Sequence, residues 1–237
     1  MASVARSFAR EGHKVHFRVL TPLSVYPPSG KVRIAAPTRM SLDTIRVFAI
    51  SKLGWIKQQQ RKLQEQERET PREYLERESH YVWGKRYLLK VSESDEAPAI
   101  ELKGSCILLR VRPGTDEQKR QALVEEWYRE QVKEAVPAVI AKWEPRMGVN
   151  VTRFFVRRMK TKWGSCNPNG RSIRLNTELA KKPRECLEYI IVHEMTHLLV
   201  RHHDERFKGL MDRHFPNWRS LRQMLNDLPL AHADWEY

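Results

Sequence analysis

Two histidines four positions apart, on a segment with helical hydrophobic spacing, constrain this chain more than any other feature. The segment begins near Pro183, because proline is favoured in the first turn of a helix. Its hydrophobic positions recur at helical intervals: Cys186, Leu187, Ile190, Ile191, Met195, Leu198 and Leu199. They predict an amphipathic helix, and this helix carries His193 and His197 in the sequence His-Glu-Met-Thr-His.

The spacing brings both imidazoles to one side of the predicted helix. Four residues turn an α-helix through about 400°, so His193 and His197 project within about 40° of each other and can bind a single ion. Glu194 lies about 100° further round, beside such an ion rather than on it. A carboxylate in that position can accept a proton from water, which is the general-base role in zinc peptidases. The pattern therefore predicts a catalytic zinc site.

A catalytic zinc site needs a third protein ligand and an open position. His202 and His203 follow closely, but a continuous helix would turn both away, so the chain must leave helical geometry after about Val200 and fold back. Asp204 can cap a new helix there. The rival oxygen ligands are Asp204, Glu205 and Asp212. The spacing to His203 matches the metzincin consensus in length, but Val200 stands where that consensus has glycine, so a metzincin is not assigned.

The segment from Trp163 to Cys166 has two interpretations. It either shapes the floor of a cleft beside the metal, or it is structural, with Trp163 anchoring a hairpin to the helix and Gly164 permitting close packing. We favour the structural interpretation. Cys166 as a fourth ligand would close the site, but no second thiol accompanies it, and we do not expect it to bind the metal.

Alternating hydrophobic residues predict strands on both sides of this segment. One strand is expected over 151–159 and another around Ile173 and Leu175, and the turn at 167–170 suggests that these two pair as a hairpin. Before them, Thr115 and Gln118 form a capping-box pattern at the start of a long helix that reaches Pro145. Pro137 is expected to kink or divide this helix. Its expected buried positions are Leu123, Trp127, Val132, Val136, Val139 and Trp143.

The first half of the chain has the pattern of a small α+β unit. We expect a strand over 31–37, a helix capped by Ser41 that continues to Gln58, a hairpin turning near Gly84, and two further short strands over 99–111. The stretch from 57 to 80 is almost entirely charged or amide-bearing, which is typical of a solvated helix or loop.

Five segments together resemble one known family. They are MKTKWGSC at 159–166, IRLN at 173–176, HEMTH at 193–197, His203 with Phe207, and FPNWR at 215–219. This set resembles the YgjP-like branch of the SprT/WLM metallopeptidases, and the resemblance covers most of residues 30–226. It implies an α+β fold with a zincin-like core, in which the active-site helix lies beside a small antiparallel sheet.

The resemblance also implies roles for particular residues. In that family an aromatic residue follows the third histidine by four positions, which selects His203 over His202 as the third ligand. A strand beside the metal allows an extended peptide to add to it by main-chain hydrogen bonds. The matching strand here implies Ile173, Leu175 and Asn176 as substrate-binding residues.

The same considerations suggest a division of the chain. We expect an N-terminal extension over 1–29, an N-terminal α+β accessory unit over 30–112, and a zincin-like metallopeptidase domain over 113–237. The position of the expected boundary is not sharply defined, because the long helix after residue 112 can belong to either half.

Composition limits the compartment and the partners. No apolar run is long enough to span a membrane, and no signal peptide is evident, so we expect a cytoplasmic protein without a membrane partner. The three cysteines are widely separated and are expected to be free thiols. The 43 Lys and Arg residues against 29 Asp and Glu give a net charge of +14, which makes DNA or DNA-associated proteins plausible partners.

Two functions are consistent with these patterns. The leading hypothesis is a zinc-dependent metalloendopeptidase acting on polypeptides, with Zn²⁺ bound by His193, His197 and His203 and with Glu194 as the general base. The alternative is a zinc-containing nucleic-acid or protein-binding module with little or no proteolytic activity. A purely structural protein with a vestigial motif is less consistent with Glu194, because a structural zinc has no use for a carboxylate beside it. The oxyanion stabiliser is left open among His202, Arg201 and a backbone amide.

Overall fold

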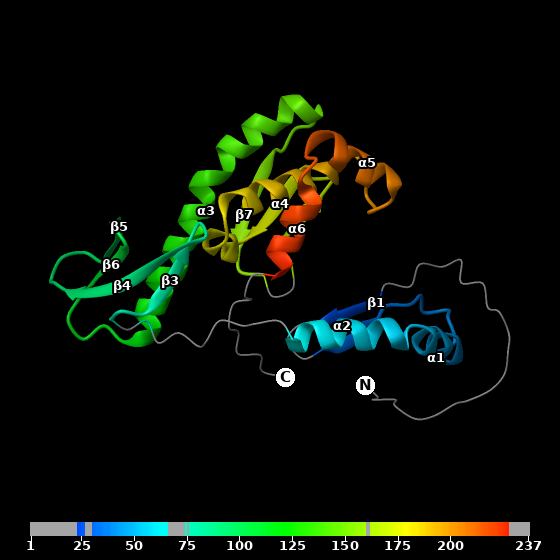
Figure 1. Cartoon of the computed structure of the whole chain (residues 1–237), viewed down its shortest axis with the longest axis horizontal. Coiled ribbons are helices and arrows are strands. Elements are labelled where there is room, and N and C mark those ends of the chain that lie inside the picture. The colour runs from blue at the N-terminus through cyan, green and yellow to red at the C-terminus, as the bar shows by residue number, and fades with distance from the viewer. Residues whose placement is uncertain (1–22, 27–29, 66–73, 75, 160–161, 228–237) are drawn as a thin grey trace. The chain divides into compact units, whose positions relative to one another are not determined.

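The computed structural model describes residues 23–26, 30–65, 74, 76–159 and 162–227 (Figure 1). By contacts between Cα atoms the chain divides into two compact units, residues 1–65 and residues 66–237. These contacts place the division between residues 65 and 66, and the boundary expected at 112 stays a hypothesis. Among the described residues, no helix is both long and apolar enough to cross a membrane.

The first unit contains a two-stranded antiparallel sheet and two helices. Its elements are β1 (Leu23–Tyr26), β2 (Lys31–Ile34), α1 (Leu42–Ser51) and α2 (Leu53–Glu65). The capping of α1 by Ser41 is confirmed, because the Ser41 hydroxyl accepts a hydrogen bond from the Thr44 N–H. The single helix expected to run to Gln58 is wrong. Lys52, at φ −105° and ψ 3°, leaves the helical region and separates α1 from α2.

The second unit begins with a four-stranded sheet. Its strands are β3 (Ser79–Val82), β4 (Lys85–Glu93), β5 (Ala99–Lys103) and β6 (Cys106–Val111), in the spatial order β3-β4-β6-β5. The hairpin expected near Gly84 is confirmed by the antiparallel pairing of β3 with β4. The two short strands expected over 99–111 are present as β5 and β6, which also pair antiparallel. The central pairing of β4 with β6 is parallel.

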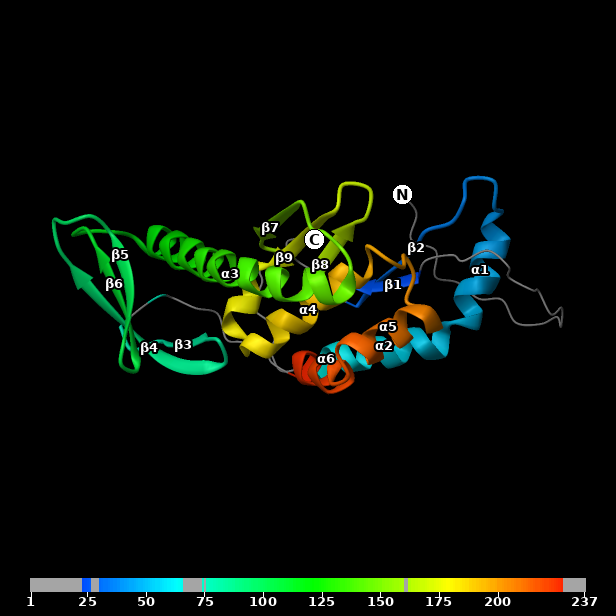
Figure 2. The ribbon, with the colours of Figure 1, turned by 90° about the horizontal axis from the view of Figure 1, so that it is seen from above.

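A long helix, α3 (Glu117–Met147), leads from this sheet toward the rest of the unit (Figures 1 and 2). The expected cap at Thr115 is wrong: the Asp116 carboxylate accepts the Lys119 N–H at 2.8 Å, and the Thr115 hydroxyl donates instead to the Arg112 carbonyl. The helix also continues through Pro137. Of the expected buried positions, Val132, Val136 and Trp143 are confirmed. The other three are shifted by one residue, because Val124, Tyr128 and Ile140 are buried in place of Leu123, Trp127 and Val139, and Met147 is buried as well.

The second sheet is small and mixed. Its strands are β7 (Arg153–Arg157), β8 (Gly164–Asn167) and β9 (Ser172–Asn176), in the order β7-β9-β8. The expected hairpin between 151–159 and 173–176 is wrong, because β7 pairs with β9 in parallel and the turn at 167–170 joins β8 to β9. Strand β8, with the sequence Gly-Ser-Cys-Asn, has no hydrophobic alternation that could have marked it.

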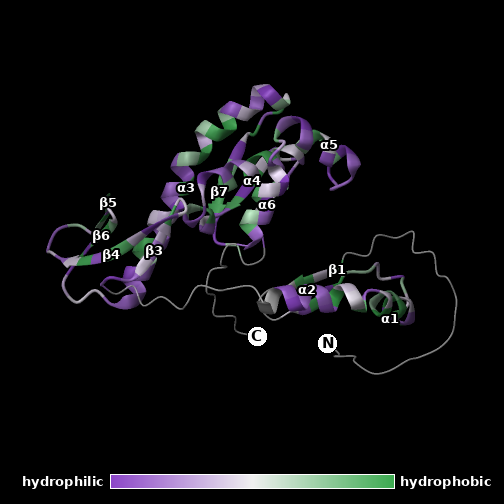
Figure 3. Ribbon diagram, viewed as in Figure 1, coloured by the Kyte–Doolittle hydropathy of each residue, from purple (hydrophilic) through white to green (hydrophobic). Residues whose placement is uncertain are grey.

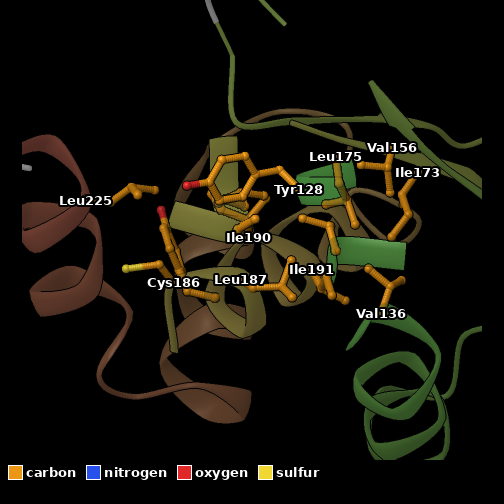
Figure 4. Close-up of a cluster of buried hydrophobic side chains, with 14 of the residues drawn as sticks. Tyr128, Val136, Val156, Ile173, Leu175, Cys186, Leu187, Ile190, Ile191 and Leu225 are labelled. Atoms are coloured by element: carbon orange, nitrogen blue, oxygen red, sulfur yellow. The ribbon is translucent and has the colours of Figure 1, made fainter. Parts of the chain in front are cut away.

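The predicted histidine-bearing helix is present as α4 (Arg184–Thr196), and it lies in the centre of this unit. It contacts β8, β9 and α3, the 3₁₀-helix η1 (Thr177–Lys181), and the helices α5 (Glu205–His214) and α6 (Trp218–Asp227). Figure 4 shows Leu187, Ile190 and Ile191 of α4 between the strand residues Ile173 and Leu175 on one side and Leu225 of α6 on the other. In Figure 3 the hydrophobic residues gather on α4 and the adjoining strands, while α5 is mainly hydrophilic.

The β3–β4 hairpin contacts the start of α4. The N–H groups of Trp83 and Gly84 donate to the carbonyls of Ala180 and Lys181. The Arg184 guanidinium lies 4.3 Å from the centre of the Trp83 ring. Residues of the four-stranded sheet therefore share one hydrophobic core with α3 and α4.

Candidate metal centre

The loop after α4 returns the chain toward the helix it has just left. Helix α4 ends at Thr196, earlier than the expected break near Val200, and His197 is its capping residue. The predicted cap of the next helix is confirmed, because the Asp204 carboxylate accepts the Phe207 N–H at 3.0 Å. This short connection between α4 and α5 carries His203 back beside His193.

The structure brings three imidazoles together. The Nε2 atom of His203 lies 3.1 Å from Nε2 of His197 and 3.0 Å from Nε2 of His193. Three nitrogen ligands about 2.05 Å from a tetrahedral zinc would lie about 3.3 Å apart, so the convergence matches what one ion requires. Phe207 packs beneath all three rings, with ring-centre distances of 5.0, 4.8 and 4.7 Å to His193, His197 and His203.

Two observations show that these nitrogens can each present a lone pair to a metal ion. Nδ1 of His197 lies 3.1 Å from the Val200 carbonyl oxygen. Since a carbonyl can only accept, Nδ1 carries the proton and the lone pair of Nε2 is directed to the other imidazoles. Burial, followed by the neighbouring His197 and His203, lowers the pKa of His193 to about 3. Burial also lowers the pKa values of His197 and His203. The three rings are thus held in the neutral form that metal binding needs.

Glu194 lies beside the imidazoles and is buried. Only 5% of its surface is exposed, and this burial raises the pKa of its carboxyl group to about 8, against a smaller lowering effect of Lys162. A carboxyl group that titrates near neutrality can both accept and release a proton. The position of this side chain on α4 is the one expected from the sequence.

Gly164 fits Glu194 closely. A Cβ atom on Gly164 would lie 2.7 Å from Oε1 of Glu194 and 2.9 Å from Cγ2 of Ile190. These separations are too short for non-bonded atoms, so β8 can approach α4 only because residue 164 has no side chain. The close-packing interpretation of Gly164 is therefore confirmed.

The imidazoles and Glu194 line a cleft of about 730 Å³. The lining includes β8 with its flanking residues Lys162 and Pro168, and it also includes residues of α6 and of the loop at 201–203. Strand β8 lies at the edge of its sheet among the described residues.

The strand that was expected to bind the substrate, β9, does not lie at an edge of its sheet. Strand β9 is the central strand of its sheet, so both of its edges are already paired, and the side chains of Ile173 and Leu175 are fully buried in the core. Asn176 is 4% exposed, and its amide nitrogen donates to the carbonyls of Met159 and Lys162 at 2.8 and 2.9 Å. The assignment of these three residues to substrate binding is wrong: two are core residues, and Asn176 holds the loop before β8.

The other candidate ligands are occupied elsewhere. Asp204 caps α5, and the Asp212 carboxylate accepts a hydrogen bond from Nε1 of Trp218. Glu205 pairs with Lys208. The Cys166 thiol lines the cleft, where burial, with a smaller effect of Glu194, raises its pKa to about 11. Among the described residues, the cluster that can hold a metal consists of His193, His197 and His203, and His202 lies in the cleft lining outside it.

Residues on α6 also line the cleft, and the sequence analysis did not identify them. Arg222, Leu225 and Asn226 face the cleft from α6, together with Tyr189 of α4. Their signal in the sequence is weak, because nothing in the spacing of α6 indicates that this helix packs against α4.

Three imidazoles converge on one point, with a buried carboxyl group beside them in the same cleft, and this set could hold a metal ion. The family model described as "YgjP-like, metallopeptidase domain" matches residues 21–228. The chain therefore belongs to the YgjP-like family and carries its metallopeptidase domain.

Comparison with solved structures gives weaker likenesses. The metallopeptidase zymogen abylysin of Pyrococcus abyssi is 18% identical, with a TM-score of 0.36, over 38% of this chain and 90% of that one. The metallopeptidase zymogen jannalysin of Methanocaldococcus jannaschii is 20% identical, with a TM-score of 0.34, over 38% of this chain and 91% of that one. No curated protein matches the chain significantly.

Proposed function

We propose that this protein is a zinc-dependent endopeptidase in which His193, His197 and His203 hold the metal and Glu194 is the general base. The observation that carries the proposal is the convergence of three neutral imidazole nitrogens beside a buried carboxyl group in one cleft. Nitrogen-only ligands in a compact set favour zinc over magnesium or calcium, which prefer oxygen ligands.

The metal and Glu194 would have separate roles in the reaction. When bound, zinc lowers the pKa of a water molecule and polarises the carbonyl group of the scissile bond. Glu194 accepts a proton from the attacking water on its carboxylate and then delivers that proton to the leaving amine. Burial raises the pKa of the Glu194 carboxyl group to about 8 in the protein without metal, and a zinc ion beside it would favour the ionised form that accepts the proton.

The exposed edge of β8 is suited to an extended peptide. The Trp163 carbonyl accepts the Asn176 N–H, so Trp163 and Ser165 face β9, and by alternation the main-chain groups of Gly164 and Cys166 face outward. A substrate can pair with these outward groups and lie across the cleft as a further strand.

Substitution of Glu194 by glutamine tests the proposal. The amide keeps the shape of the side chain but cannot accept the proton, so the variant should retain zinc and lose at least about a hundredfold in hydrolysis of an unfolded protein substrate. Elemental analysis measures the metal, and gel assays with and without chelator measure cleavage.

A Glu194→Gln variant that cleaves at the wild-type rate would contradict the role of Glu194. Zinc-loaded wild-type protein that cleaves no polypeptide, yet binds DNA or a protein partner, would instead favour the binding module.

A further inference from the structure

The charges that line the cleft are mostly of one sign. Among the described lining residues, Lys162, Arg201 and Arg222 are cationic, whereas Glu194 is the sole carboxylate. The three cations come from separate parts of the chain: the segment before β8, the loop after α4, and α6.

Within the described part of the chain these cations lie in no ion pair, although Lys162 acts electrostatically on Glu194. Cations close to them in sequence do form ion pairs: Arg219 pairs with Asp212, and Lys208 with Glu205. The two paired cations, Arg219 and Lys208, lie outside the cleft lining, whereas the other three cations lie in it. A cleft with walls of one charge concentrates ions of the opposite charge.

Arg222 is the cation best placed to act on a substrate. It lines the cleft together with His193 and His203, and it is carried by helix α6, which packs against the helix α4 that carries His193. A planar guanidinium with several donors is well matched to a carboxylate.

We propose that this cleft selects anionic peptide segments, with Asp or Glu side chains next to the scissile bond, and that Arg222 is the main determinant of this specificity. The inference rests on the proposed peptidase function and adds the substrate class. Peptides rich in Lys or Arg are disfavoured by the same charges, so discrimination comes from repulsion as well as attraction.

A binding experiment tests this without requiring turnover. The probes are two fluorescein-labelled peptides that alternate Leu with Glu or Leu with Gln, and the zinc-loaded protein carries Glu194→Gln to prevent cleavage. We expect fluorescence anisotropy to show binding of the Glu peptide about tenfold tighter at low salt, with a smaller preference at high salt. Adding Arg222→Gln should reduce the preference about threefold, and Arg222→Lys should keep most of it.

Arg213→Gln is the matched control, because Arg213 is exposed on α5 outside the cleft lining, and it should leave the preference unchanged. Zinc content establishes that each variant keeps its metal site. Equal binding of the two peptides, or a preference that Arg222→Gln leaves unaltered, would overturn the proposal. So would single-stranded DNA that displaces the Glu peptide and whose own binding requires Arg222, since the cleft would then be a nucleic-acid site.

A different result would show that the proposed peptidase function is wrong. If zinc-loaded wild-type protein cleaves neither peptide while the Arg222-dependent preference in binding persists, the cleft selects anionic peptides and hydrolysis is the part that is wrong.

Discussion

Glu194 depends on a neighbour that is far from it in sequence. Its position on α4 follows from the helix, but the space for its carboxyl group exists because residue 164 has no side chain. The motif that contains Glu194 is local, whereas the wall that confines it comes from another strand. A change at residue 164 should therefore affect the chemistry more than the metal.

Replacement of Gly164 by alanine tests this dependence. The new Cβ would meet Oε1 and Cγ of Glu194 at 2.7 and 2.9 Å, so either β8 or the carboxyl group must move. We expect peptide hydrolysis to fall at least about tenfold and the free energy of unfolding to fall by about 1–3 kcal/mol, with zinc content unchanged.

Gly209→Ala in α5 is the control for this substitution. Nothing lies within 4 Å of a Cβ at that position, so alanine should stabilise the helix by about 0.5–1 kcal/mol and leave hydrolysis unaltered. Unfolding in urea and a peptide cleavage assay measure both effects. Full activity in Gly164→Ala would show that the close contact with Glu194 does not matter.

The residues of the site differ in how far the sequence predicts them. His193, His197 and Glu194 follow from the geometry of one helix, because their angles are fixed by residue spacing. Asn176 does not, since its role is to bond the Met159 and Lys162 carbonyls of a loop that only the folded sheet brings near. A polar side chain at the end of a strand has the same appearance in the sequence whether it binds a substrate or a loop.

Among the elements, the β3–β4 hairpin has a supporting role for α4. Its tip donates two main-chain hydrogen bonds to η1, immediately before α4 begins. Gly84 at this tip has φ +79°, and a Cβ there would lie 2.9 Å from Cγ of Pro183, the residue that precedes α4. The hairpin thus fixes the start of the helix that carries two of the imidazoles.

Two glycine substitutions separate this contact from simple backbone strain. Gly84→Ala and Gly104→Ala both place alanine at positive φ, which costs about 1–2 kcal/mol each, but only the first also meets Pro183. We expect Gly84→Ala to lower the free energy of unfolding by about 1–2 kcal/mol more than Gly104→Ala. Chemical denaturation followed by circular dichroism measures the difference, and equal losses would mean that the hairpin tip does not support α4.

The elements were predicted well where hydrophobic spacing marks them and poorly where it does not. The helix at 184–196 and the strands of the four-stranded sheet follow from periodicity and turn residues. Strand β8 was missed because its ladder with β9 and its contact with α4 stabilise a sequence of small and polar residues. That omission also led to the wrong hairpin.

At the scale of the whole molecule, the metal centre and the four-stranded sheet belong to one unit. Buried residues of β4 and β6, such as Leu89 and Ile107, lie in the same hydrophobic cluster as Val132 of α3 and Ile191 of α4. The accessory unit expected over 30–112 stays a hypothesis, and this shared core favours a division nearer residue 65. Composition could not reveal the division, because charged residues are spread through both halves.

Metal binding should stabilise this unit as a whole. A ligand that binds only the folded state adds about 2.7 kcal/mol when its free concentration is a hundred times its dissociation constant. We expect zinc to raise the unfolding midpoint of the wild type, chelator to lower it, and His203→Ala to abolish the response while His202→Ala keeps it. Thermal unfolding at fixed zinc measures this, and the reverse pattern for the two histidines would make His202 the ligand.

The three proposed metal ligands and strand β8 come together in different ways as the chain folds. All three imidazoles come from residues 193–203, a short segment that closes at little cost in entropy, whereas Gly164 lies thirty residues before Glu194 and reaches it only as part of β8. We therefore expect an incompletely folded chain to capture its metal before β8 is in place. Such a chain would hold zinc without the strand edge that aligns a peptide, which would limit cleavage of other chains during synthesis.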